Sequence, residues 1–108
     1  MTLNQYQAEA IKTATYGSGH SIIYPTLGLA GEAGEVADKV KKVIRDNNGV
    51  FTDELKEQIM FEVSDCLWYC AALARDLGYT LEETAQKNLD KLRSRMERGV
   101  ISGSGDNR

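Results

Sequence analysis

The chain has 108 residues, of which 42% are hydrophobic and 27% charged, and its formal net charge at pH 7 is −3. This size fits one domain over residues 1–108 with one small core, so we expect an oligomer in which a second subunit helps to form any cleft. The acidic balance argues against a nucleic-acid duplex or an anionic membrane as the main partner, and the lack of a long apolar run or export signal favours a cytoplasmic protein.

The first half of the chain predicts two helices. Thr2 and Gln5 have the spacing of a capping box, and the apolar residues that follow recur at helical spacing up to about Tyr16. Pro25 marks the first turn of a second helix, which runs to about Asp46.

The second half predicts two more helices. Thr52 caps a third helix that Gly78 ends, and Thr80 caps a fourth that runs to Arg98. An Asn-Asn-Gly sequence at 47–49 supplies a left-handed turn between the second and third helices. No segment alternates with a period of two, so the chain is predicted to be all-α, a four-helix bundle with short connections.

The third helix is expected to be the most buried, yet it carries acids in its middle. One face is apolar and predicts core: Leu55, Ile59, Val63, Cys66, Cys70, Leu73 and Leu77. The opposite side is also largely apolar, with Glu62 and Asp65 among its few polar interruptions. Because a carboxylate buried without a partner is strongly destabilising, these two acids need a cation.

The second helix repeats this design. Glu32 and Glu35 lie on the shoulder of its apolar stripe, at the same angular offset as the acids of the third helix. Packed together, the two helices would gather four carboxylates that repel one another without cations, and oxygen ligands alone favour magnesium, manganese or calcium over zinc. Gly31 and Gly34 each cost about 1 kcal/mol relative to alanine in a helix interior, so we expect the backbone beside them to approach a neighbouring helix or a ligand closely.

The fourth helix carries a candidate anion site. Asn88 falls in the centre of its apolar stripe, and Lys91 and Arg95 lie at the adjoining edge. An amide beside two cations on a core-facing side is typical of phosphate binding. An asparagine bonded to a backbone carbonyl, next to two solvated cations, is an equally simple structural reading.

These motifs together resemble a known family. The chain contains Glu32-x-x-Glu35, then a spacer of 26 residues and then Glu62-x-x-Asp65. This pattern resembles the paired acidic motif of the MazG-like all-α nucleoside triphosphate pyrophosphohydrolases. The resemblance spans roughly residues 6–98 and includes a phosphate-contacting helix that matches Asn88, Lys91 and Arg95. The glycine-rich tail is similar to that of small single-domain MazG-like proteins. Gly31 stands where many family members have a further glutamate.

The resemblance implies hydrolysis of a normal or modified (deoxy)nucleoside triphosphate to the monophosphate and pyrophosphate, with Mg²⁺ as cofactor and Mn²⁺ as a substitute. It implies that all four motif acids hold the metal, and we expect Glu35 also to orient or deprotonate the attacking water. We further expect the C-terminal tail to fold over the metal cleft of its own or a neighbouring subunit, where Arg108 would bind phosphate. A frayed terminus is the alternative.

Two other classes of function stay open. One is a non-catalytic helical module that binds a structural metal or a nucleotide. The other is a ferritin-like di-iron protein, but that site needs Glu-x-x-His, and the only histidine, His20, lies in a predicted loop. We interpret Phe61 and Trp68, on the outer face of the third helix, as a subunit seam rather than a base-stacking platform. Cys66 and Cys70 are interpreted as core residues, not as a disulfide.

Overall fold

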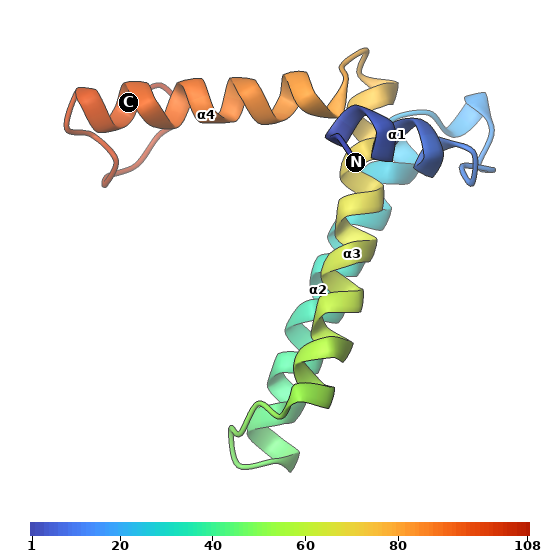
Figure 1. Cartoon of the computed structure of the whole chain (residues 1–108), viewed down its shortest axis with the longest axis vertical. Helices are drawn as coiled ribbons and strands as arrows, with labels where there is room; N and C mark the ends of the chain where they lie inside the picture. The colour runs from blue at the N-terminus through green and yellow to red at the C-terminus, as the bar shows by residue number, and fades with distance from the viewer.

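The computed structural model describes residues 1–108 and contains helices but no strand, which confirms the all-α prediction. Its elements are α1 (Leu3–Ile11), a short 3₁₀ turn η1 (Ser18–His20), α2 (Ile23–Asp46), α3 (Asp53–Asp76) and α4 (Leu81–Glu97). Figure 1 shows α2 and α3 side by side as a long hairpin, with α1 across its open end and α4 projecting from that end at a steep angle. No helix is long and apolar enough to cross a membrane.

The predicted caps set most helix boundaries. Thr2 accepts a hydrogen bond from the Gln5 backbone N–H while the Gln5 side chain accepts one from the Thr2 N–H, so the capping box is confirmed. Thr52 and Thr80 each accept from the backbone N–H three residues on, as predicted. The left-handed turn after α2 is present at Asn48 (φ 53°) and Gly49 (φ 73°).

Helix α1 is shorter than predicted, ending at Ile11 rather than near Tyr16. The carbonyl of Ala10 accepts from the backbone N–H and the hydroxyl of Thr13, and also from the indole N–H of Trp68 on α3. These tertiary and side-chain bonds replace the next turn of helix and direct the chain across the top of α3. Because Trp68 lies 58 positions further along the chain than Ala10, the local sequence could not indicate this early end of α1.

A buried glutamine joins three helices at the junction. The Gln7 side-chain amide donates to the carbonyls of Ala71 (3.0 Å) and Tyr79 (3.3 Å), and its oxygen accepts from the N–H of Leu81 (3.0 Å). Since each polar atom of this side chain has a partner, its burial carries no unpaired-group penalty. The junction therefore fixes α1, the end of α3 and the start of α4 relative to one another.

The core lies only in part on the face of α3 that the sequence predicted, where Leu55 and Ile59 are half-buried beside Val43 of α2. Val63 and Leu77, assigned to the core, are 51% and 53% exposed, whereas Ala71 and Ala72, assigned to the opposite side, are fully buried. The core prediction was wrong for Val63 and Leu77, whereas the burial of Ala71 and Ala72 agrees with the largely apolar opposite side of α3, which α1 covers at the C-terminal half of the helix. The expected core face instead lines the inner side of the angle between α3 and α4, with Cys70, Leu73 and Leu77 in a pocket there.

A single chain is not compact. Its radius of gyration is 16.7 Å, where a compact chain of this length has about 13 Å. Only 9 of 108 residues are buried. The four helices therefore do not form a closed bundle within one chain, and the prediction of a bundle fails at that level: α4 lies as an arm away from the hairpin (Figure 1).

Candidate functional site

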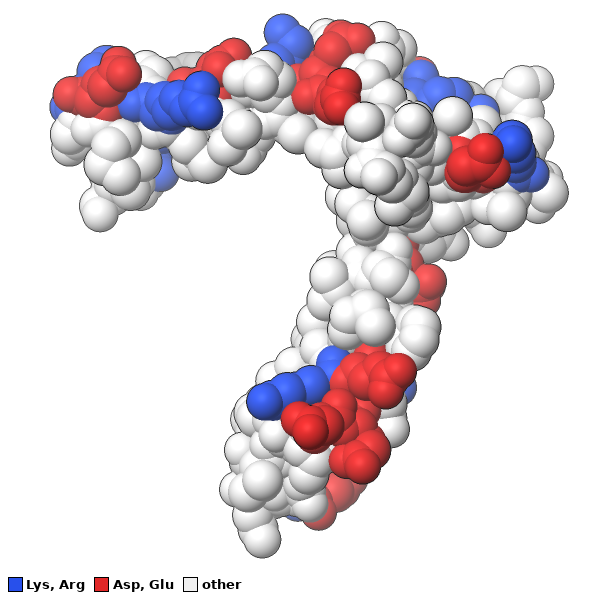
Figure 2. All heavy atoms as spheres, in the orientation of Figure 1, with Lys and Arg blue, Asp and Glu red and all other residues white.

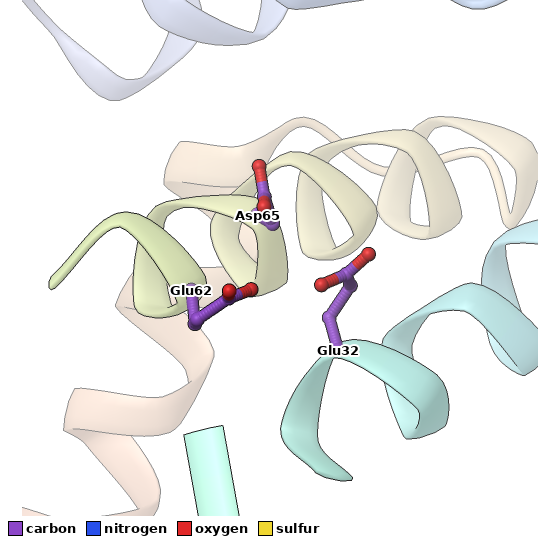
Figure 3. A group of neighbouring side chains, drawn as sticks. All are labelled: Glu32, Glu62 and Asp65. Atoms are coloured by element: carbon purple, nitrogen blue, oxygen red, sulfur yellow. The ribbon is translucent and has the colours of Figure 1, made fainter. Parts of the chain in front are cut away.

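Three of the four predicted acids meet where α2 and α3 face each other. Glu32 reaches from α2 toward α3, where Glu62 and Asp65 stand one turn apart (Figure 3). One carboxylate oxygen from each lies within 4.8 Å of those of the other two. Glu32 and Glu62 are partly buried and Asp65 is exposed. The expectation that the acidic shoulders of the two helices face one another is thus met by these three residues.

Glu35 stands outside this group. It lies one turn after Glu32 on α2, its side chain is exposed, and it is not among the acids that converge. Its charge nevertheless acts on Glu32, because it contributes to the raised pKa of that residue. The predicted roles of Glu35 as ligand and base stay predictions.

The neighbouring acids oppose the ionisation of Glu32. The pKa of Glu32 is raised, first by burial and then by the charges of Asp65, Glu62 and Glu35. A cation between these oxygens would remove the repulsion, which is the physical reason for regarding the group as a metal site rather than a structural one.

One cation already lies beside the acids, and sequence reasoning missed it. Lys39 of α2 places its ammonium nitrogen 3.6 Å from Glu62 Oε1, and both side chains are largely shielded from solvent. Lys39 follows Glu32 by seven residues, which is two helical turns, so the two side chains share one face of α2. That i,i+7 relationship between an acid and a lysine was the signal that could have found it.

The donor set suits a hard divalent cation. Opposite ligands of Mg²⁺ are about 4.2 Å apart, twice a ligand distance of about 2.1 Å, so oxygens spread over 4.8 Å need only a small rotamer adjustment to close on it. Carboxylate oxygens without histidine or thiolate are the ligands expected for Mg²⁺ or Mn²⁺. His20 lies in η1 and is exposed, and neither Cys66 nor Cys70 belongs to the acidic group.

The close backbone approach on α2 occurs at a glycine that the sequence did not single out. A Cβ at Gly28 would collide with the ring of Tyr69 on α3, whereas one at Gly31 or Gly34 would meet nothing within 4 Å. The close approach to a neighbouring helix expected at Gly31 and Gly34 is therefore absent within a single chain, and the close approach to a ligand stays a prediction. Gly28 lets α2 and α3 approach one turn before Glu32, which brings the acids of the two helices within reach of each other.

The predicted phosphate clamp on α4 does not face the acids of its own chain. Asn88 and Lys91 are exposed on the arm, and α4 meets the hairpin only at its N-terminal end (Figure 1). Arg95 is 7% exposed, and its guanidinium donates to the carbonyl of Asp106 at 2.8 Å. If Asn88 and Lys91 contact phosphate, they do so in the site of another subunit.

The C-terminal tail folds back on α4 and not over the acids of the same chain. The Arg108 guanidinium donates to three backbone carbonyls, those of Val100, Ile101 and Gly105. In Figure 1 the C-terminus lies along the arm, far from the α2–α3 interface. The predicted clasp over the chain's own metal cleft is not formed because this guanidinium is satisfied locally. Contact with a neighbouring subunit stays a prediction.

Comparison with known proteins identifies the hairpin and the arm as a recognised unit. A family model described as "MazG nucleotide pyrophosphohydrolase domain" matches residues 23–100. This range begins with α2 and ends just after α4, so it contains all three converging acids and leaves α1 outside. A protein of Mycobacterium phage L5, named "Gene 37 protein", is 48% identical over 114 aligned residues that cover the whole of both chains. No solved structure matches the chain.

Proposed function

The chain belongs to the MazG nucleotide pyrophosphohydrolase family, and from this premise we propose that it hydrolyses a normal or modified (deoxy)nucleoside triphosphate to the nucleoside monophosphate and pyrophosphate. The observation that carries the proposal is the convergence of Glu32, Glu62 and Asp65 from two helices to within 4.8 Å. In a chain of this family, such a group of carboxylates is the part that an Mg²⁺-dependent phosphoanhydride hydrolase requires.

Each acid has a proposed role. Glu32, Glu62 and Asp65 would hold Mg²⁺, with Mn²⁺ as a substitute. The ion, when bound, supplies neutralisation of the polyphosphate charge and Lewis-acid activation of the reaction. Glu35, which is exposed one turn beyond Glu32, would rotate in as a fourth ligand or would orient the attacking water and take its proton. The reaction consumes one water and breaks the bridge between the α- and β-phosphates.

The proposal requires a second copy of the chain. The inner side of the angle between α4 and the hairpin is largely uncharged (Figure 2), and an apolar pocket of about 340 Å³ opens there, lined among others by Leu29, Leu73 and Leu77. A lone chain would leave this surface in water, which is unfavourable for a patch of this kind. We propose that a second copy fills the angle as a homo-oligomer.

In such an assembly, Asn88 and Lys91 of one chain would reach the phosphates bound at the acids of another. Arg95 and Arg108 would first have to release the tail carbonyls that they hold. Sedimentation at micromolar concentration tests the assembly: a stable monomer would contradict it and would leave the acids without a phosphate clamp.

The activity is tested with a panel of triphosphates and Mg²⁺, assayed for monophosphate and pyrophosphate. We expect both products in equal amounts from the preferred substrate, and none after chelation of the metal. Release of inorganic phosphate alone would contradict the proposed bond cleavage. Binding of Mg²⁺ without any turnover across the panel would favour the non-catalytic module.

A further inference from the structure

A pocket next to the acids has an aromatic wall. It has a volume of about 340 Å³ and is lined by Thr13, Glu32, Asp65, Trp68 and Tyr69. Two of the three converging acids therefore form one side of a cavity whose other side is an indole and a phenol. A surface that combines carboxylates with aromatic rings suits a ligand that has a cation-carrying part and a flat part.

The indole of Trp68 is held in a fixed orientation. Its ring N–H donates to Thr13 Oγ1 at 2.8 Å and to the carbonyl of Ala10 at 3.2 Å. The Thr13 hydroxyl in turn donates to that same carbonyl at 2.7 Å, so its hydrogen is used and its oxygen is left to accept from the indole. Trp68 also meets Tyr69 edge to face, with ring centroids 5.0 Å apart.

This arrangement changes the interpretation of Trp68 as a subunit seam. Trp68 is partly covered by α1 of its own chain, and it lines a pocket with Glu32 and Asp65 rather than a flat apolar patch. Phe61, grouped with it in the sequence, is 57% exposed and takes no part in the pocket. The hydroxyl and carbonyl that fix the indole come from the segment before residue 23, which lies outside the family match.

The opposite end of the acidic group carries a positive charge instead. Lys39 lies 3.6 Å from Glu62, and Glu62 is one turn of α3 further from the aromatic pocket than Asp65. Along the hairpin the order is therefore aromatic wall, then acids, then lysine. This polarity is built into the spacing of residues on two antiparallel helices and does not depend on a second subunit.

We propose that this order fixes the direction in which the substrate binds: the nucleobase lies against Trp68 and Tyr69, and the terminal pyrophosphate lies toward Lys39. The proposal rests on the proposed function for the identity of the ligand. Stacking on an aromatic ring stabilises a base by about 1–3 kcal/mol and tolerates any base, because every base has a π-face. Pyrophosphate is repelled by carboxylates and attracted by an ammonium group, so it belongs at the lysine end.

The only tryptophan in the chain is Trp68, so fluorescence excited at a wavelength that indole absorbs and the five tyrosines do not reports on this pocket. With Mg²⁺ present, titration with a nucleoside monophosphate is expected to quench the fluorescence saturably, and titration with inorganic pyrophosphate is expected to leave it unchanged. If no monophosphate in a panel of common bases quenches it, the base platform is wrong, whether or not triphosphates are hydrolysed. If monophosphates quench it and no triphosphate is hydrolysed, the proposed activity fails and the platform stands.

Calorimetric titration of two variants tests the direction. Trp68→Leu is expected to raise the Kd of the monophosphate about fivefold or more and to leave that of Mg²⁺-pyrophosphate within about twofold. Trp68→Phe keeps a stacking face and should restore most of the monophosphate affinity. Helical content measured for both variants separates loss of binding from loss of folding.

Lys39→Met is expected to have the reverse effect: it should raise the Kd of Mg²⁺-pyrophosphate about fivefold or more and leave the Kd of the monophosphate nearly unchanged. Lys41→Met is the matched control, because Lys41 lies on the same helix and pairs with Asp38 rather than with the acidic group; it should change neither affinity. If the two variants exchanged their effects, the substrate would bind in the opposite direction. If Trp68→Leu left monophosphate affinity unchanged, the residue would serve only to hold α1 or a neighbouring subunit.

Discussion

The backbone N–H of Ile22 donates to the carboxylate of Asp76 at 2.9 Å, and Ile22 holds a conformation that its side chain disfavours. Its φ of 67° and ψ of −55°, with a 2.7 Å bond from the Ile23 N–H to the Ser21 carbonyl, define a strained γ-turn. The same carboxylate accepts from the hydroxyl of Tyr16 at 2.8 Å. A nearly buried acid at the end of α3 thus sets the angle at which the chain enters α2.

Replacing Ile22 with glycine is expected to stabilise the protein. A β-branched residue at positive φ costs about 1–3 kcal/mol, and the extra chain entropy of glycine offsets about 0.5–1 kcal/mol of the gain. We expect the free energy of unfolding in urea to rise by about 1 kcal/mol. Ile23→Gly is the control: Ile23 is exposed and helical, so glycine there should destabilise. A fall in stability for Ile22→Gly would mean that the side chain contributes packing that outweighs the strain.

Asp76→Asn is expected to destabilise the chain by about 1.5–3 kcal/mol, the usual loss for hydrogen bonds to a charged group. Burial acts to raise the pKa of Asp76, but the Ile22 N–H, the Tyr16 hydroxyl and Arg75 together hold it below its ordinary value. An acid with a lowered folded pKa stabilises the protein above its unfolded pKa, which is about 3.9. That contribution is lost as pH falls through the folded value.

The pH dependence provides the check. The difference in unfolding free energy between the native chain and Asp76→Asn should be constant from about pH 5 to neutrality and should shrink below about pH 4. A difference that stayed constant down to pH 2 would show that Asp76 acts through shape and not through its charge.

Gly28→Ala is expected to lower stability by about 1–3 kcal/mol, because its Cβ would collide with the ring of Tyr69 and push α2 away from α3. Gly31→Ala makes the same chemical change where nothing lies within 4 Å, so it should raise helix stability by up to about 1 kcal/mol. Thermal unfolding of both variants measures this contrast in sign. Equal effects would show that helix propensity alone determines the result at both positions.

Local patterns predicted the helices well because their signals are local. Thr2, Thr52 and Thr80 mark helix starts through hydrogen bonds to residues three positions away. The acids at 62 and 65 share a face of α3 because residues three positions apart lie on the same side of a helix. The facing of Glu32 with those two acids also followed from periodicity on two helices. The helix boundaries need no knowledge of how distant segments pack, whereas the facing of Glu32 with the acids of α3 also required that the two helices pack through their apolar stripes.

What failed depends on distant partners. Trp68 sets the early end of α1. The buried face of α3 depends on which side of it α1 covers. The close approach at Gly28 depends on Tyr69, which lies on another helix. Glu35 is exposed and stays outside the acidic group, although its i,i+3 spacing from Glu32 is the same as that between Glu62 and Asp65, so spacing along one helix does not decide which acids converge. The position of α4 relative to the acids could not follow from sequence patterns within one chain.

The last prediction concerns the repulsion among the acids in the metal-free protein. Asp65→Asn removes one of the charges that raise the pKa of Glu32, so without metal its melting temperature is expected to equal or exceed that of the native chain. Mg²⁺ should raise the melting temperature of the native chain by mass action and should have little effect on the variant, and hydrolysis should be lost.

The sign of the pH effect follows from the raised pKa of Glu32. An acid whose folded pKa lies above its unfolded value binds its proton more tightly in the folded state, so metal-free stability should rise as pH falls through the folded pKa of Glu32 toward its unfolded pKa. The rise should be smaller in Asp65→Asn. Glu57→Gln is the matched control, because Glu57 is an exposed acid of α3 outside the group, and it should preserve the Mg²⁺ response, the pH response and turnover. If Asp65→Asn kept most of its activity, or if Glu57→Gln lost it, the three converging acids would not be the metal site.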